Sequence, residues 1–357
     1  MSVNKPLPKG LFILEGISLV SFNKDFTQVA LSKKDNFIYI YSVEDIMNTD
    51  KWKLLYKLED HYQYISGLDW SHETNRLLSC SYDKTSFVWD FIDNKWNPSN
   101  VVVTTKLGYL CCKWNKRGDK FCEGTSARQL LIGYFNKKSN WWMGWNIKVH
   151  KSSVVACEID PTSLFVLSGS TDLKVYISSC YIPEVDDQFL TDETKPLARD
   201  FGQTIYEFKP NCWVNSVAWL PSGDLGLVAG QDSTIILINY KEGSSDIIRC
   251  KHTPVTHIIP ITDSSFYAAC YDRNILEYEK KGEEWTIAKV ITDQNKEDNK
   301  STEDDSKELE KPIKKGNIVV RTKQENHLHK SQISSINIKG KEMITTDLSG
   351  FVKYWKL

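Results

Sequence analysis

Several features that identify common protein classes are missing from this chain of 357 residues. Its longest purely apolar runs, such as LFVL at 164–167 and IILI at 235–238, are far shorter than the roughly 20 residues of a membrane-spanning helix. Near the N-terminus the run LFIL stops at Glu15, so it is too short for the core of a signal peptide. The sequence therefore predicts neither a membrane span nor secretion.

An excess of charge of one sign is also absent, since 45 basic and 46 acidic residues leave a formal net charge of −1. This balance provides no basic surface for nucleic acid or an anionic membrane, and we predict neither as a partner. The nine cysteines form no CxxC pair. We expect reduced thiols in a cytoplasmic protein, with a nuclear pool not excluded.

Motifs for catalysis and for cofactors are equally scarce. Neither phosphate-binding pattern, G-x4-G-K-[ST] or G-x-G-x-x-G, occurs, and the seven histidines never take metal-ligand spacing. Cys111 and Cys112 are adjacent in an expected strand without a positioned histidine, which argues against a catalytic thiol. We predict no enzyme activity, no cofactor and no metal.

What the chain has instead is a succession of short runs rich in Val, Ile, Tyr, Phe and Trp, separated by Gly, Asn, Asp and Ser turns. In the clearest unit, residues 61–90, strands are expected at 65–70 and 77–81, and a third ends at Trp89. Asp83 stands six residues before Trp89, and this step recurs in intact or degraded form at seven turn positions. These are Asp35, Asp83, Arg128, Asp172, Asp232, Asp272 and Ser349.

Seven such units predict an all-β, seven-bladed WD40 β-propeller, because four of the six intervals lie near the 40–45 residues of a four-stranded blade. The chain ends two residues after Trp355, so the last blade lacks its own fourth strand. We expect the N-terminal run GLFILEG, residues 10–16, to supply that strand and close the ring. Residues 1–357 are interpreted as a single propeller domain.

In the second unit a histidine accompanies the turn aspartate, since His61 lies 22 residues before Asp83. With a hydroxyl of the second strand, Ser79 or Ser81, and with Trp89, this pair resembles the buried hydrogen-bond tetrad of WD repeats. The resemblance implies a structural role, because a buried network with every member satisfied holds the turn to the strand.

The same spacing of 22 residues separates His150 from Asp172 in a later unit. A His–Asp–Ser set also invites interpretation as a catalytic triad. The spacing is that of a blade-stabilising network, so both histidines are interpreted as structural.

The two longest intervals between units require insertions. The first, at about 183–209, has some apolar content, and we expect part of it to pack on the ring. The second, at 293–315, has 14 charged residues among 23 and no aromatic residue. Such a segment cannot bury enough surface to offset its ordering entropy, so we expect a disordered loop, with a partner-binding arm as the alternative.

Several stretches are more specific than the repeat: ISLVSFNKDFTQVAL (17–31), GYFNKKSNWWMGWNIK (133–148), SCYIPEVDDQ (179–188) and WVNSVAWLPSGDLGLVAGQDSTI (213–235). With the C-terminal HLHKSQISSI and TTDLSGFVKYW, they resemble the WD-repeat subunit, subunit 1, of the actin-related protein 2/3 complex, which nucleates branched actin filaments. SAR at 126–128 also resembles that family's third blade, where Arg128 replaces the usual Asp. The resemblance runs through all seven blades.

This resemblance implies a non-catalytic scaffold that binds the other subunits and supports nucleation through assembly and activator docking. Actin filament and nucleation-promoting factor would be contacted through the complex. In that family the insertion between the last two blades carries a short apolar-containing helix implicated in contacts with actin, and the polar 293–315 segment departs from it. The alternative is a WD40 scaffold of another assembly, such as a ubiquitin-ligase receptor or a chromatin complex.

Three tryptophans lie within five positions in SNWWMGWN, residues 139–146, which we expect to form the outer strand of blade three. Adjacent residues of a strand face opposite sides, so Trp141 and Trp142 cannot pack against the same neighbouring blade. One ring belongs in the core between blades, and the other is either covered by blade edges or anchors another subunit. With Trp145 and Arg128, these two are the candidate partner contacts.

Overall fold

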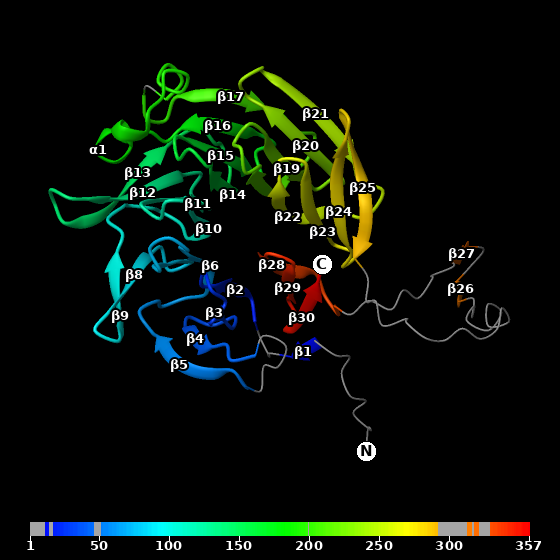
Figure 1. The fold of residues 1–357 in the computed structure, drawn as a ribbon, viewed down its shortest axis with the longest axis horizontal. Helices are drawn as coiled ribbons and strands as arrows, with labels where there is room; N and C mark the ends of the chain where they lie inside the picture. The colour runs from blue at the N-terminus through cyan, green and yellow to red at the C-terminus, as the bar shows by residue number, and fades with distance from the viewer. Residues whose placement is uncertain are drawn as a thin grey trace.

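The computed structural model describes residues 17–45, 51–198, 200–291 and 329–357, together with the backbone of three short strands at 11–13, 313–315 and 318–320. Seven four-stranded antiparallel sheets are arranged as blades around a centre (Figure 1). The all-β, seven-bladed propeller predicted from the repeats is confirmed.

The first four blades follow the chain without a break. Blade one contains β2 (Leu19–Phe22), β3 (Gln28–Ser32), β4 (Ile38–Ser42) and β5 (Lys53–Leu58). Blade two contains β6 (Ile65–Trp70), β7 (Leu77–Ser81), β8 (Ser86–Ile92) and β9 (Lys95–Asn100). Blade three contains β10 (Tyr109–Trp114), β11 (Lys120–Thr125), β12 (Leu130–Asn136) and β13 (Trp141–Ile147). Blade four contains β14 (Val154–Ile159), β15 (Phe165–Ser170), β16 (Val175–Ser179) and β17 (Thr204–Phe208).

The last three blades complete the ring. Blade five contains β18 (Val214–Trp219), β19 (Gly226–Gly230), β20 (Thr234–Asn239) and β21 (Ser244–Arg249). Blade six contains β22 (Val255–Thr262), β23 (Ser265–Cys270), β24 (Ile275–Lys281) and β25 (Glu284–Ile291). Blade seven contains β28 (Ile333–Lys339), β29 (Glu342–Asp347), β30 (Phe351–Lys356) and β1 (Leu11–Ile13).

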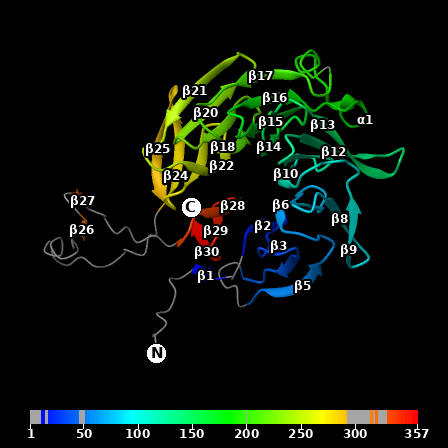
Figure 2. The same cartoon turned by 180° about the vertical axis from the view of Figure 1, so that it is seen from behind.

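The ring is closed by the N-terminal strand, as predicted. β1 pairs antiparallel with β30, with Leu11 opposite Lys353 and Ile13 opposite Phe351, and the two strands lie side by side in both ribbon views (Figures 1 and 2). This pairing covers an edge that would otherwise present unpaired backbone groups.

The core lies between the blades rather than within one layer. The second strands β7, β15 and β19 are buried at every residue, because a neighbouring blade covers each face of the sheet. Seven apolar clusters result, one at each junction between adjacent blades. The burial of these clusters is the main favourable term holding the blades together.

Two boundaries differ from the sequence-based expectation. The third strand of blade two does not end at Trp89, because β8 continues to Ile92 and pairs along its whole length with β9. The insertion at 183–209 lies within blade four, and its end forms the outer strand β17. Ahead of β17 come the helix α1 (Pro183–Asp186) and the 3-10 helix η2 (Asp187–Phe189).

The predicted loop at 293–315 lies outside the described residues, except that the backbone of β26 (Ile313–Lys315) pairs with that of β27 (Ile318–Val320). Among the described residues, no helix combines the length and apolar character needed to cross a membrane.

Candidate functional site

The four expected tetrad residues of blade two form one continuous chain of hydrogen bonds. His61 Nε2 lies 2.8 Å from Ser79 Oγ, which also accepts the indole N–H of Trp89 at 2.8 Å. His61 Nδ1 lies 3.2 Å from Asp83 Oδ2. In the tautomer that carries its hydrogen on Nδ1, the ring donates to the Asp83 carboxylate, which can only accept, and Nε2 accepts the Ser79 hydroxyl. Ser81 instead donates to the backbone carbonyls of the preceding loop, so Ser79 is the tetrad hydroxyl.

The Asp83 carboxylate is bound by more than the histidine. It accepts the backbone N–H groups of Tyr62 and Thr85, each at 2.7 Å, and the Thr85 hydroxyl. Burial alone would raise the pKa of Asp83, but the bonds from His61, Thr85 and Tyr62 outweigh it and hold the pKa well below its usual range. The side chain therefore remains a carboxylate that ties two loops together.

Blade four repeats most of this network. His150 Nε2 lies 2.9 Å from Ser168 Oγ, and His150 Nδ1 lies 3.2 Å from Asp172 Oδ2. The tryptophan position holds Ser178, whose buried hydroxyl has no hydrogen-bond partner among the described residues. Burial lowers the pKa of His150 despite the nearby Asp172 carboxylate, which favours a neutral ring.

Blade seven contains a complete tetrad that the sequence did not reveal. Thr345 Oγ1 lies 2.7 Å from His329 Nε2 and accepts the indole N–H of Trp355 at 2.7 Å. Asp347 Oδ2 lies 3.3 Å from His329 Nδ1. Ser349 occupies the turn position as predicted, since Gly350 after it has a φ of 86°, but the carboxylate comes from Asp347 two residues earlier, which accepts the N–H of Ser349. A histidine 18 residues before an aspartate was the signal available.

Blade three has no tetrad, and its register differs from the prediction by one residue. In blades two and four the residue after the turn aspartate has a positive φ, as Lys84 (71°) and Leu173 (61°) show. Arg128, with φ of 67°, occupies this following position. Ala127, and not Arg128, thus replaces the aspartate. Arg128 is exposed at the turn.

In place of the tetrad, blade three buries a carboxyl group. Glu123 lies at the position of Ser79, is fully buried, and accepts a hydrogen bond from Ser86 of blade two. Burial raises the pKa of Glu123 to about 8. Gly133 takes the tryptophan position, where a Cβ would lie 2.0 Å from the ring of Phe121. The Phe121 ring leaves no space there for a side chain.

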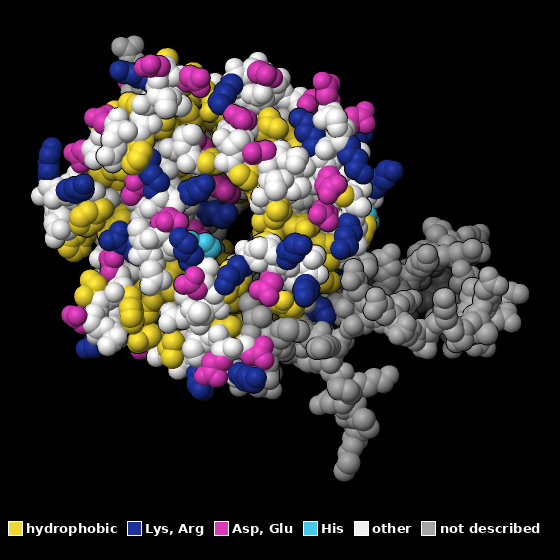
Figure 3. All heavy atoms as spheres, viewed as in Figure 1, with side chains coloured by type: hydrophobic (Ala, Val, Ile, Leu, Met, Phe, Trp, Pro, Cys, Tyr) yellow, Lys and Arg dark blue, Asp and Glu magenta, His cyan; other side chains and the backbone are white. Residues whose placement is uncertain are grey.

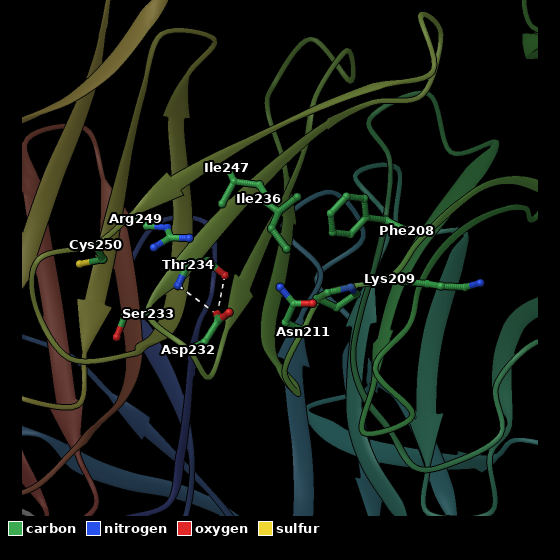
Figure 4. Close-up of a pocket in the computed structure, with 11 residues that line it drawn as sticks. Phe208, Lys209, Asn211, Asp232, Ser233, Thr234, Ile236, Ile247, Arg249 and Cys250 are labelled. Atoms are coloured by element: carbon green, nitrogen blue, oxygen red, sulfur yellow. Dashed lines mark hydrogen bonds between the residues drawn. The ribbon is translucent and has the colours of Figure 1, made fainter.

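Blade five keeps the turn aspartate but has no tetrad histidine, and a hollow of about 350 Å³ lies beside it (Figure 4). Asp232 accepts the Thr234 hydroxyl at 2.5 Å and its N–H at 3.3 Å. Phe208 and Ile236 face each other across the hollow, and Arg249 approaches Thr234 in the same view. Without a histidine, Asp232 binds its own turn, and a hydrogen bond from the Cys212 thiol is its link to the preceding loop.

The structure separates the adjacent tryptophans of β13, which lies at the outer edge of blade three. Trp142 is 2% exposed and packs against Trp114 and Phe121 of the core between blades two and three. Trp142 as a partner contact was therefore wrong, because its ring is part of the core. Trp141 is 47% exposed, and its indole N–H donates to the Asn100 carbonyl at 2.7 Å.

Trp145 lies on the same side of β13 as Trp141 and is 37% exposed. Its ring meets Tyr134 and Phe201 edge-on, with centroids 5.5 and 5.0 Å away. Figure 3 shows hydrophobic side chains gathered at this edge of the molecule, over β8, β9 and the β12–β13 hairpin, whereas basic and acidic groups are interspersed elsewhere on the face in view.

The motif YIPEVD forms a buried anchor for the insertion of blade four. Asp186, in α1, is fully buried and accepts Lys120 Nζ at 2.6 Å and Arg117 Nη2 at 2.5 Å. Lys120 is also fully buried, and it donates to the carbonyls of Ser163 and Cys180 at 2.6 and 2.9 Å. The motif thus joins the insertion to blade three through paired charges. The sequence offered no signal for Lys120.

No group of three or more His, Cys, Asp or Glu side chains able to hold a metal ion occurs within the residues that the structure describes. The nine cysteines are all free thiols. Burial raises the pKa of Cys112, which disfavours the nucleophilic thiolate.

Comparison with known proteins agrees with this architecture. The family model of the WD domain, G-beta repeat, matches residues 52–90, 144–177 and 202–239. A chain in the crystal structure of the mitotic checkpoint complex superimposes with a TM-score of 0.71, covering 100% of this chain and 96% of that one. Only 15% of the residues are identical, so the likeness concerns the fold alone.

Relatives from animals, plants and fungi share one name. The chain is 27% identical to actin-related protein 2/3 complex subunit 1A-A of Xenopus laevis over 362 residues, which cover 96% of this chain and 95% of the relative. Identity to subunit 1A of Arabidopsis thaliana is 28%, covering 73% and 69% of the two chains. Identity to subunit 1 of Schizosaccharomyces pombe is 24%, covering 71% and 67%. The chain is thus a WD-repeat propeller that is homologous, over most of its length, to subunit 1 of the actin-related protein 2/3 complex.

Proposed function

We propose that this protein is a non-catalytic scaffold subunit of an actin-related protein 2/3 complex and supports the nucleation of branched actin filaments. The observation that carries this proposal is the match to a relative named as subunit 1 over 96% of the chain. A match of this extent includes the blades and the specific stretches between them, whereas a generic WD40 propeller would share only the repeat.

The state of the polar side chains supports a scaffold rather than an enzyme. His61 and His150 have partners on both ring nitrogens, and the aspartates that face them are engaged by backbone N–H groups. A general acid or base needs a free position within hydrogen-bond distance of a substrate. These networks have no such position, so their role is to stabilise the blades.

Trp141 is the residue we propose as a subunit contact. Its ring is half exposed, and the bond from its indole N–H to Asn100 holds it in one orientation, which lowers the entropy lost on binding. Trp145 and Phe201 extend the same edge. Aromatic rings held in this way are typical of the residues that dominate interface energetics.

The proposed partners beyond the other subunits follow from membership of the complex. Contacts with the actin filament and with a nucleation-promoting factor would be made by the assembled complex, at the actin cytoskeleton in the cytoplasm. Nucleic acid and membrane are not proposed as partners.

Affinity purification of the tagged full chain, with identification of the co-eluting proteins, tests the proposal. The expected result is recovery of two actin-related proteins and the smaller subunits. Recovery of ubiquitin-ligase or chromatin components instead would overturn it. Trp141→Ala should reduce recovery of the subunits, because loss of an aromatic hot spot weakens the binding free energy by about 2 kcal/mol. Ile247→Ala, an exposed residue of β21 in blade five, is the control and should assemble normally.

A further inference from the structure

A second hollow, of about 240 Å³, lies between blades three and four. It is on the face of the propeller formed by the loops that join second to third strands and by the loops that join successive blades. We call this the b–c face, and the opposite one the a–b face. Three basic and three hydroxyl side chains line the hollow: Lys106, Arg128, Lys151, Ser126, Ser152 and Ser153.

The three cations come from three different loops and converge without counter-ions. Lys106, Arg128 and Lys151 are exposed, and none of them forms an ion pair within the part of the chain that the structure describes. The Asp172 carboxylate, on the next turn of blade four, lies beside these loops and is engaged by His150 and by the N–H groups of Lys151 and Lys174. Three cations beside this one carboxylate leave the hollow with a net positive charge.

The loss of the tetrad in blade three explains why this charge survives. Blades two and four place a carboxylate, Asp83 or Asp172, beside the loop from the preceding blade. Blade three has Ala127 there, which lines the hollow but carries no charge. Arg128 follows with φ of 67°, the conformation that the neighbouring turns share, so the backbone of the turn fixes where its side chain begins.

The hydroxyl groups of the lining serines add hydrogen-bond donors. Ser126 Oγ and Ser153 Oγ make no hydrogen bond with any residue that the structure describes, and Ser152 Oγ accepts from Thr171 Oγ1 at 2.8 Å, which leaves its own hydrogen free to donate. Three cations and three available O–H donors are suited to an oxyanion with several acceptor oxygens and more than one charge. A phosphate monoester carries about −1.5 to −2 at neutral pH and offers three such oxygens.

We propose that this hollow binds the phosphate group of a phosphorylated serine or threonine on a partner protein. Charge-assisted hydrogen bonds from Lys106, Arg128 and Lys151 would hold the phosphate oxygens. A peptide is favoured as the carrier because apolar surface is at hand: Leu107, 50% exposed, lines the hollow, and Tyr82, 43% exposed, packs against the following residue, Gly108. These provide contact surface for the residues on either side of a phosphorylated side chain.

Fluorescence anisotropy with the purified full chain tests the proposal. The probe is a fluorescein-labelled peptide, Gly-Leu-Gly-phosphoserine-Gly-Leu-Gly, compared with the same peptide carrying serine or glutamate at the central position. We expect the phosphorylated peptide to bind about tenfold or more tightly than either, since the phosphate brings about −1.5 to −2 of charge and three acceptor oxygens, whereas the glutamate has a single charge and the serine none. Binding should weaken as salt is added.

Charge reversal locates the site. Lys106→Glu combined with Arg128→Glu should abolish the preference for the phosphorylated peptide, while the melting temperature stays unchanged because both side chains are exposed. The matched control, Lys116→Glu with Lys341→Glu, makes the same change of charge in loops of the a–b face and should retain full binding.

Four outcomes would overturn the proposal. The first three are equal binding of the serine peptide, equal binding of the glutamate peptide, and the same loss of binding in the control variant. The fourth is peptide binding that occurs only when inositol hexakisphosphate is added to the assay, which would indicate that the hollow binds a soluble polyphosphate instead. Because the assay uses the isolated chain, its result is independent of whether the chain assembles with actin-related proteins.

Discussion

Blades two and three are neighbours with the same four-stranded topology, but different buried polar groups stabilise each of them. Blade two uses the imidazole and hydroxyl of a tetrad, with its one carboxylate bound by backbone N–H groups. Blade three has glutamate, alanine and glycine at three of those positions, and it buries a carboxyl group and, in Lys120, an ammonium group. The propeller architecture therefore tolerates the loss of a tetrad where aromatic packing and buried ion pairs take over.

The largest expected loss of stability, and the strongest test of this comparison, comes from disrupting the buried ion pair of blade three. Asp186→Ala leaves Lys120 buried without its carboxylate, and removal of one partner of such a pair costs about 3–5 kcal/mol of stability. Urea denaturation measures the loss. The control is Lys138→Ala, which disrupts an exposed pair with Glu184 in the same region and should have little effect. An unchanged urea midpoint for Asp186→Ala would show that the pair is not needed.

A similar loss should follow from removal of the aromatic core of blade three. Trp142→Ala deletes a ring that packs on Trp114 and Phe121, and we expect a loss of about 3–5 kcal/mol. Trp141→Ala, on the other side of the strand, should change the melting curve little. If both variants melt early, the separation of the two rings into a core residue and a surface residue fails.

A smaller loss should follow from disruption of the tetrad of blade two. Asp83→Ala leaves buried polar groups unpaired, at roughly 1–3 kcal/mol for each, and thermal unfolding should shift down. Asp232→Ala is the matched control, since this aspartate binds its own turn and no histidine. Equal shifts for the two variants would remove the tetrad as the source of the difference.

The smallest expected effect is a dependence of folding stability on pH that comes from the buried carboxyl group of blade three. Since burial raises the pKa of Glu123 from 4.5 to about 8, the folded protein keeps a proton that the unfolded chain has released. Stability should therefore fall as pH rises between about 4.5 and 8, by about 1.4 kcal/mol from pH 6 to pH 7. Glu123→Gln should lose this slope when urea denaturation is repeated at both pH values. A variant that keeps the full slope would assign it to another group.

Much of the architecture could be predicted from short stretches of the sequence. Short alternating strands, turn residues and a repeat near 44 residues predict blades, and the apolar N-terminal run GLFILEG was expected to supply the outer strand that pairs with β30. The His61 tetrad was also accessible, because its members lie at fixed offsets within one repeat. Where a blade departed from those offsets, counting failed: it placed the turn of blade three one residue beyond Ala127, and it missed Asp347 as the source of the carboxylate in blade seven.

What the sequence by itself determined, then, is the number of blades, the strands within them and the tetrad of blade two, all of which depend on spacing within some 45 residues. Only the tertiary structure decided which tryptophan of β13 is buried, that Lys120 meets Asp186 66 residues later, and that Lys106, Arg128 and Lys151 converge on one hollow. The physical reason is that these outcomes depend on contacts between neighbouring blades. Strand pleat, blade twist and ring closure set those contacts together, and no local pattern encodes them.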